Sequence, residues 1–215
     1  MLVLVEGQTE EVFVNRVLAP HLWQHEVAAT PTILETRHLP GRTRDKGGVS
    51  SWSKTRNDIL MRLGDTDAVT TTILDFYGLP DDFPGRGLPR TNSPIQDVLA
   101  VEAAMAAEFQ NPRFVPFLAL HEFEAWVFSM PQAIAAHFGK PSLAAKIEVV
   151  AGAFPSVEHI NHGPETHPSR RLETMIPEYK KRSDGPTILE AVGVSGVRLR
   201  CPHFHDWLSR LEALP

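Results

Sequence analysis

The chain has very little cysteine, and its hydrophobic residues never form a long run. Cys201 is the single cysteine among 215 residues, which excludes an internal disulfide and favours a reducing compartment. No apolar stretch approaches about 18 residues, so we expect no membrane span. The first apolar run covers only Leu2 to Val5 and lacks the basic start and cleavage site of a signal peptide. Together these absences predict a cytoplasmic globular protein.

An excess of positive charge is also absent. The formal net charge is −5, whereas a protein that binds nucleic acid by charge alone would usually be basic. The basic residues gather instead in two stretches. These are Arg37, Arg42, Arg44, Lys46, Lys54 and Arg56, and then Arg170, Arg171, Lys180, Lys181 and Arg182. An acidic total with local basic groups fits a metal-dependent enzyme acting on phosphates, and it fits ordinary solvated surfaces equally well.

Short β-rich stretches alternate with helical patterns through the first 130 residues. We expect strands at residues 2–5, 32–39, 68–78 and 113–120, with Pro116 marking an edge or a bulge in the last. We expect helices at residues 12–18, capped by Thr9 and stopped by Pro20, and at 52–63, 95–109 and 121–128. This alternation predicts an α/β fold with a mostly parallel sheet flanked by helices.

Strand signals fade after about residue 130. The remainder reads as short helices separated by proline and glycine. We therefore expect an α/β core over residues 1–130 and a helical C-terminal extension over 131–215, packed on the core as a single structural unit.

Acidic residues follow three of the four predicted strands. Glu6 follows the first, Asp75 ends the third, and the fourth runs into His121-Glu122-Phe123-Glu124. Ligands of open α/β sheets bind outside the carboxyl ends of the strands, so these carboxylates are expected to converge. Clustered carboxylates repel one another unless a cation is present, and Mg²⁺ or Mn²⁺ suits such oxygen ligands.

The individual acids carry different expectations. Glu10 lies four residues after Glu6 and faces the same ion if the intervening turn is helix-like. Glu122 and Glu124 are two positions apart and cannot share one helical face. We therefore expect one of them, preferably Glu124, to bind metal while the other caps a helix or pairs with a basic residue. The competing interpretation of each acid is a helix-capping or loop role.

The stretches "VEGQTEE", "TTTILDFYGLPDDFPG", "FLALHEFEAWVF", "HPSRRLETMIPEYKK" and "CPHFHDW" resemble domain-of-unknown-function family 4276 and span nearly the whole chain. "VEGQTEE" and the later aspartate also look like the TOPRIM fold of topoisomerases, primases and overcoming-lysogenization-defect nucleases. That resemblance implies a TOPRIM-like sheet and divalent-metal-dependent phosphodiester hydrolysis on DNA or RNA. It also implies an ATPase partner and a role in phage defence.

The resemblance implies that Glu6 and Asp75 hold the metal, and the acid pattern adds Glu124 as the third expected catalytic residue. The expected metal site thus consists of Glu6, Glu10, Asp75, Glu122 and Glu124. The Asp-x-Asp pattern of the TOPRIM fold reads Asp75-Phe76-Tyr77 here, so its second aspartate is missing. Two other classes therefore stay open. One is a catalytically inactive TOPRIM-like binding or regulatory subunit, and the other is a phosphoryl-transfer enzyme acting on nucleotides.

Substrate phosphates are expected at the basic stretches. The predicted phosphate-binding residues are Arg42, Arg44, Lys46, Arg170 and Arg171, the last two in the first turn of a helix whose N-terminus suits an anion. "DKGGVSSW" lacks the full P-loop pattern, so nucleotide binding of that type is rejected. The cysteine and histidines near residue 201 lack the paired spacing of a structural zinc site.

Overall fold

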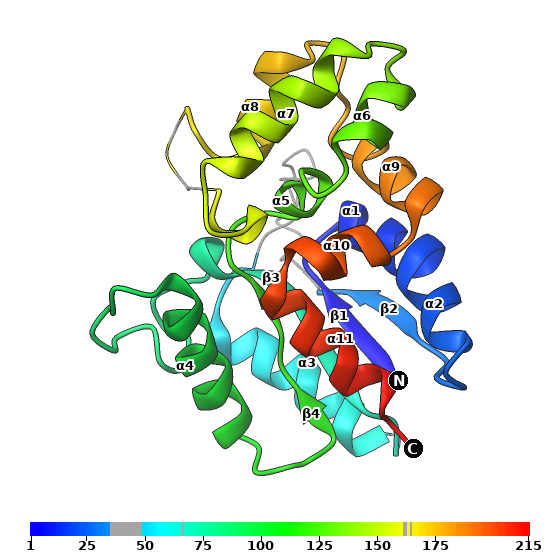
Figure 1. The fold of residues 1–215 in the computed structure, drawn as a ribbon. Coiled ribbons are helices and arrows are strands. Elements are labelled where there is room, and N and C mark those ends of the chain that lie inside the picture. The colour runs from blue at the N-terminus through cyan, green and yellow to red at the C-terminus, as the bar shows by residue number, and fades with distance from the viewer. Residues whose placement is uncertain (35–48, 66, 161–162, 164) are drawn as a thin grey trace, which may run out of the picture.

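The centre of the molecule is a parallel β-sheet (Figure 1). The computed structural model describes residues 1–34, 49–65, 67–160, 163 and 165–215. Its strands run in the order β2-β1-β3-β4, and β5 also pairs with β3. Val5 of β1 lies opposite Ile33 of β2 and Ile73 of β3. The strands are β1 (Leu2–Val5), β2 (Thr30–Ile33), β3 (Thr70–Asp75), β4 (Phe114–Val115) and β5 (Leu118–Ala119). The expected α/β fold with a parallel sheet is confirmed.

The outer strand is interrupted at Pro116, where the sequence predicts an edge or a bulge. Proline has no N–H to donate to a neighbouring strand, so the ladder breaks between β4 and β5. The Thr72 side chain spans the break: its Oγ1 donates to the Phe117 carbonyl at 2.9 Å and accepts from the Phe117 N–H at 3.0 Å. A side chain of β3 thus supplies the hydrogen bonds that the backbone lacks there.

The first helical run differs from its prediction at both ends. It comprises α1 (Gln8–Phe13), a π-helical segment (Val14–Leu18) and α2 (Ala19–Trp23). Gly7, not Thr9, occupies the N-cap position, and Thr9 is buried within α1. Pro20 does not stop the helix, because it lies in the first turn of α2, where a missing N–H is tolerated directly after the wider π turn.

The remaining helices follow the predicted order with shifted ends. The helices predicted at 52–63 and 95–109 are confirmed, and Gly64 lies inside the last turn of the first of them. The predicted strand at 32–39 begins earlier, at Thr30, and positions 35–39 lie outside the described residues. The helices are α3 (Trp52–Asp65), α4 (Pro94–Ala107), α5 (Glu124–Val127), α6 (Pro131–His137), α7 (Ser142–Gly152), α8 (Pro168–Met175), α9 (Asp184–Val192), α10 (Ser195–Arg200) and α11 (Pro202–Glu212), with short 3₁₀ turns at Phe76–Gly78 and Val157–His159.

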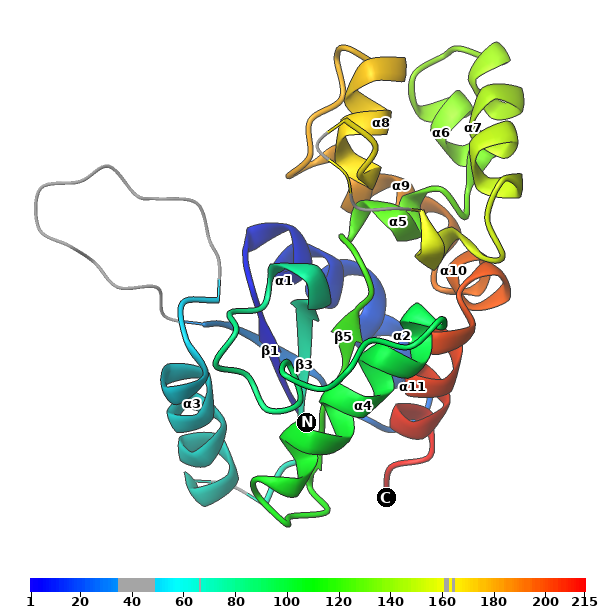
Figure 2. The same ribbon diagram turned by 90° about the vertical axis from the view of Figure 1, so that its left-hand side faces the viewer.

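Hydrophobic cores cover both faces of the sheet. Val3 and Val5 of β1 pack into a core with α1, α2 and helices α5 to α11. Leu4, which points to the opposite face, packs with Ile59 of α3 and Val101 of α4. α3 and α4 lie to the left of α11 in Figure 2. Burial on both faces is typical of parallel sheets and explains why the strands are apolar throughout.

The C-terminal helix α11 packs directly on the sheet. Trp207 of α11 packs within the core of β1 and donates from Nε1 to Thr71 Oγ1 of β3 at 2.9 Å. Helices α6, α7 and α8 lie beyond the carboxyl ends of the strands in both views (Figures 1 and 2). The division at residue 130 stays a prediction. Among the described residues, no helix has the length and apolar character needed to cross a membrane.

Candidate functional site

The carboxyl ends of β1 and β3 bring Glu6 and Asp75 together. The two strands are direct neighbours, and the Asp75 N–H donates to Glu6 Oε2 at 3.2 Å. Gly7 then takes an extended conformation, and α1 begins at Gln8. A Cβ added at Gly7 would lie 3.4 Å from Glu10 Oε2, so the Glu10 carboxylate turns back toward the strand end. Three predicted site residues therefore converge on one edge of the sheet.

The segment after β5 adds Glu122 and Glu124, and both contact one lysine. Lys181 Nζ lies 3.3 Å from Glu122 Oε1 and 3.2 Å from Glu124 Oε2. Glu124 starts the short helix α5, whereas Glu122 precedes that helix. The helix predicted from His121 is wrong, because α5 begins only at Glu124, so the two acids are not confined to different faces of one helix. Glu122 pairs with a basic residue, as expected of one member of the pair, and the choice of metal ligand between the two stays a prediction. Because Glu122 lies in the loop before α5, both carboxylates reach the ammonium group of Lys181.

Glu122 is held by the N-terminus of α8. Its Oε2 accepts from the Ser169 N–H at 2.9 Å, and its Oε1 accepts from Ser169 Oγ at 3.2 Å. His167 Nδ1 lies 3.2 Å from Oε2. The sequence places a phosphate at this helix N-terminus, but the anion found there is a carboxylate of the protein. The helix end attracts negative charge either way.

The electrostatics separate these acids into two kinds. Burial is the main cause that raises the pKa of Glu6 to about 7 and of Glu124 to about 7. Burial, and then the charge of Glu6, raises the pKa of Asp75 well above its usual range, and burial also raises that of Glu10. For Glu122, burial opposes ionisation, but Lys181 and the Ser169 hydrogen bonds lower its pKa. The site thus holds acids that resist ionisation beside one that is firmly ionised.

Lys181 is the site residue that sequence reasoning did not single out. It belongs to the basic stretch predicted to hold substrate phosphates, yet its ammonium faces the carboxylates. Burial opposes its charge, but Glu124, Glu122 and Asp75 outweigh that effect and raise the pKa of Lys181. The side chain is still 41% exposed, so it lies at the mouth of the site. No local motif marks it, because it meets the acids only through the path of α8 and the loop that follows.

The predicted phosphate-binding arginines of this region point elsewhere. Arg170 pairs with Glu165 at 3.2 Å, and Arg171 Nε donates to the Thr166 carbonyl at 2.6 Å and lies over the Phe154 ring. The other predicted phosphate-binding residues, Arg42, Arg44 and Lys46, lie outside the described residues.

The missing aspartate is not replaced from the loop that follows β3. Tyr77, at the second aspartate position, stacks on the His121 ring with centroids 4.5 Å apart and planes 4° from parallel. Asp82 accepts from the Trp52 N–H through both oxygens, at 3.0 Å and 2.9 Å, and so caps α3. The carboxylates near Glu6 and Asp75 whose charges act on them are Glu10 and Glu122, and Glu124 joins the group through Lys181.

The oxygen atoms of the site are of the kind that binds a hard cation, but the distances between them are too long for them to share one. Carboxylate oxygens are the ligands that Mg²⁺ and Mn²⁺ prefer. Neither oxygen of the buried Glu124 has a hydrogen-bond partner among the described residues, although Lys181 pairs with one of them. Within the described chain, however, no three of these carboxylates bring ligand atoms within 4.8 Å of one another. Binding an ion would require the acids to draw together around it.

The fold and this edge define an α/β protein with a parallel sheet and a cluster of carboxylates at the carboxyl ends of its strands. The chain belongs to the family described as Domain of unknown function (DUF4276), whose model matches residues 5–212. The predicted family membership is confirmed. No curated protein and no solved structure matches the chain, so the TOPRIM likeness stays a prediction.

Proposed function

We propose that this protein is a divalent-metal-dependent nuclease, which hydrolyses phosphodiester bonds in DNA or RNA. The observation that carries the proposal is the convergence of Glu6 and Asp75 at the carboxyl edge of the sheet, with Glu124 linked to Asp75 through Lys181. Glu6 and Glu124 each have a pKa of about 7. Strongly perturbed carboxylates gathered at a strand edge are typical of catalytic sites. A structural ion-pair network would instead favour acids with lowered pKa values.

Asp75 and Glu6 are the proposed anchors of Mg²⁺ or Mn²⁺, with Glu10, Glu122 and Glu124 as further ligands. Such an ion activates water and stabilises the charge of a phosphodiester in transfer. Whichever of Glu6 and Glu124 does not bind the ion can exchange a proton with the reacting groups near neutral pH, because each has a pKa of about 7. Lys181, half-exposed between Glu122 and Glu124, is placed to contact a substrate phosphate at the mouth of the site.

The wider setting follows from the family resemblance. The proposed substrate is nucleic acid, held by the basic stretches, and the proposed surroundings are the cytoplasm. The resemblance to overcoming-lysogenization-defect nucleases adds an ATPase partner protein and a role in phage defence to the proposal.

The test is a cleavage assay on single- and double-stranded DNA and RNA oligonucleotides with Mg²⁺ or Mn²⁺. We expect Asp75→Asn and Glu6→Gln each to reduce the rate by roughly 100-fold or more, the scale of a lost acid–base group. Glu11→Gln, one residue beyond Glu10 on α1, is the matched control and should leave the rate unchanged. Equal cleavage by all four proteins, or no cleavage with either ion, would refute the nuclease.

One observation favours the alternative, a catalytically inactive binding or regulatory subunit. Lys181 already supplies a positive charge to Glu122 and Glu124. A lysine in that position can stabilise the fold where a metal ion is no longer bound. Calorimetry with Mn²⁺ separates the two functions: binding that is lost in Asp75→Asn supports the enzyme, whereas no binding by either protein supports the inactive subunit.

A further inference from the structure

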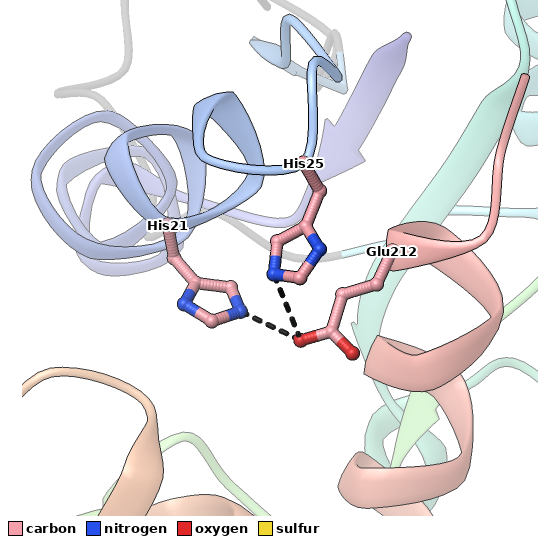
Figure 3. A group of neighbouring side chains, drawn as sticks. All are labelled: His21, His25 and Glu212. Atoms are coloured by element: carbon pink, nitrogen blue, oxygen red, sulfur yellow. Dashed lines mark hydrogen bonds and ion pairs between the residues drawn. The ribbon is translucent and has the colours of Figure 1, made fainter.

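A second group of ligand-type side chains lies far from the acidic edge. His21 of α2, His25 in the turn that follows it, and Glu212 at the end of α11 bring one ligand atom each within 4.8 Å of one another (Figure 3). His21 Nε2 lies 2.7 Å from Glu212 Oε1, and His25 Nε2 lies 3.7 Å from the same oxygen. Both imidazole rings point at the carboxylate in Figure 3. No other group of three such residues meets this spacing in the described part of the chain.

The local sequence explains why the two histidines meet. They are four positions apart in "HLWQH", and residues with that spacing on a helix lie on one face. His25 remains near the helix because its N–H donates to the Leu22 carbonyl at 2.9 Å, and the Val27 N–H donates to the same carbonyl at 3.1 Å. The backbone of this turn is therefore fixed, and so is the direction of the second ring.

Two helix ends add a field that favours a cation. The histidines lie at the C-terminal end of the helical run that finishes with α2, and Glu212 is the last residue of α11. Each helix carries a partial negative charge at this end. The Glu212 carboxylate adds a full charge, since Arg198 and His21 lower its pKa although burial opposes ionisation. The partial negative charges of these two helix ends favour a cation here, whichever side chains bind it.

The distances lie on either side of those around a tetrahedral ion. Bonds of about 2.0–2.2 Å to imidazole nitrogen and carboxylate oxygen place the ligand atoms of a Zn²⁺ site roughly 3.3 Å apart. The two separations measured here, 2.7 Å and 3.7 Å, lie on either side of that value. Small side-chain rotations would therefore suffice. His25 is 40% exposed, which leaves room for water at a fourth position.

Glu212 Oε1, the oxygen that both histidines approach, also accepts from an arginine. Arg198 Nη1 donates to Glu212 Oε1 at 2.6 Å, while its Nη2 donates to Ser209 Oγ at 2.8 Å and its Nε to His205 Nδ1 at 2.9 Å. A hydrogen-bonded partner of a ligand carboxylate fixes it in place, as in the second layer of metal sites, and here the guanidinium and the proposed ion would share Oε1. The same contact also describes a plain ion-pair network, so the test must separate the two.

We infer that His21, His25 and Glu212 form a binding site for one divalent transition-metal ion, with Zn²⁺ as its first candidate. Two imidazoles and one carboxylate suit Zn²⁺ or Co²⁺ and not Mg²⁺. The ion would join α2 to α11, whose ligands are 191 positions apart in the chain. The site does not depend on the proposed nuclease function, since it shares no residue with the acidic edge.

The experiment uses the full chain without a polyhistidine tag, stripped of metal with a chelator and then dialysed. Zn²⁺ is titrated by calorimetry in the presence of excess Mg²⁺, which occupies oxygen-only sites. Co²⁺ is titrated separately by visible absorption, because tetrahedral Co²⁺ has a strong characteristic band. We expect one Zn²⁺ per chain and a tetrahedral Co²⁺ spectrum for the wild type.

The test variant is His25→Ala, and the matched control is His137→Ala. His137 also ends a helix and pairs with a carboxylate, Asp184 at 3.3 Å, but within the described part of the chain it belongs to no group of three ligand-type side chains. His25→Ala should weaken Zn²⁺ binding by at least roughly tenfold and remove the Co²⁺ band, since even second-layer changes weaken metal sites by about 10- to 100-fold. His137→Ala should bind as the wild type does.

Three results would overturn the inference: no saturable Zn²⁺ binding by the wild type, equal binding by His25→Ala, or equal loss in His137→Ala. Because His25 is exposed, its removal should leave the far-ultraviolet circular dichroism spectrum unchanged. If it does not, His25→Gln serves as the second variant and is judged by the same two titrations.

Discussion

Replacing Glu124 with glutamine should stabilise the metal-free protein at alkaline pH. Glu124 is completely buried, and that burial raises its pKa from 4.5 to about 7 although Lys181 acts in the opposite direction. The folded chain therefore resists losing this proton. At about 1.4 kcal/mol per tenfold change in the equilibrium constant, ionisation is less favourable in the folded state by about 3 kcal/mol.

The sign follows from the two protonation states. Below about pH 4.5 the carboxyl holds its proton in both the folded and the unfolded chain, so it contributes no pH dependence. Between pH 4.5 and about 7 the unfolded chain releases the proton first, and the free energy of unfolding falls as the pH rises. Above about pH 7 the carboxyl is ionised in both states, and the free energy of unfolding falls no further. Glutamine at this position cannot ionise and avoids that loss.

The assay is urea unfolding followed by tryptophan fluorescence, at pH 5 and at pH 8.5, without divalent metal. We expect Glu124→Gln to exceed the wild type by about 3 kcal/mol at pH 8.5 and by less than about 1 kcal/mol at pH 5. Glu173→Gln, which alters an exposed glutamate on α8, should follow the wild type at both values. A Glu124→Gln protein less stable than the wild type at pH 8.5 would mean that the Lys181 ion pair outweighs the burial of the charge, and would refute the reasoning.

Three further outcomes are expected. Thr72→Val should lower the free energy of unfolding by about 2–4 kcal/mol, because it leaves both the N–H and the carbonyl of Phe117 without their buried partner; urea unfolding that matches the wild type would contradict this. Trp207→Phe should lower the free energy of unfolding by about 1 kcal/mol, because it removes the hydrogen bond to Thr71 Oγ1. In a double-mutant cycle with Thr71→Val, the two changes in the free energy of unfolding should not be additive. Mn²⁺ affinity should rise about tenfold between pH 6 and pH 8, as the Glu6 carboxyl with its pKa of about 7 loses its proton; an affinity that calorimetry finds independent of pH would remove Glu6 from the ligands.

The sequence predicts the sheet and the acids at its strand ends because both depend on short-range patterns. The run "TTTILD" has β-branched residues and ends in Asp75, so the strand and the place of its carboxylate follow together. Glu6 behaves in the same way after β1. Parallel pairing then requires the two carboxylates to lie at one edge, which is a consequence of topology and needs no knowledge of side-chain packing.

The remaining features of the site depend on contacts between distant segments. Lys181 reaches Glu122 across 59 positions, and no local pattern separates it from the surface lysine beside it. Glu122 was placed on a helix because "HEFEAWVF" has helical composition, yet the chain turns only at Glu124. Pro20 was read as a stop, whereas a π-helical segment before it absorbs the change in helix geometry. In each case tertiary structure overrides a correct local preference.

The position of α11 in the chain has a consequence for synthesis. This helix covers one face of a sheet whose strands are all complete by residue 119, and its Trp207 occupies the core of that face. During translation, the part of this face that α11 covers therefore stays open while roughly 90 further residues are added, although α1 and α2 already pack on the same face. Such surfaces bind chaperones and associate with one another. Nascent chains arrested before α11 should consequently be bound by holdase chaperones. Chains that are long enough to include α11 outside the ribosome should no longer be bound.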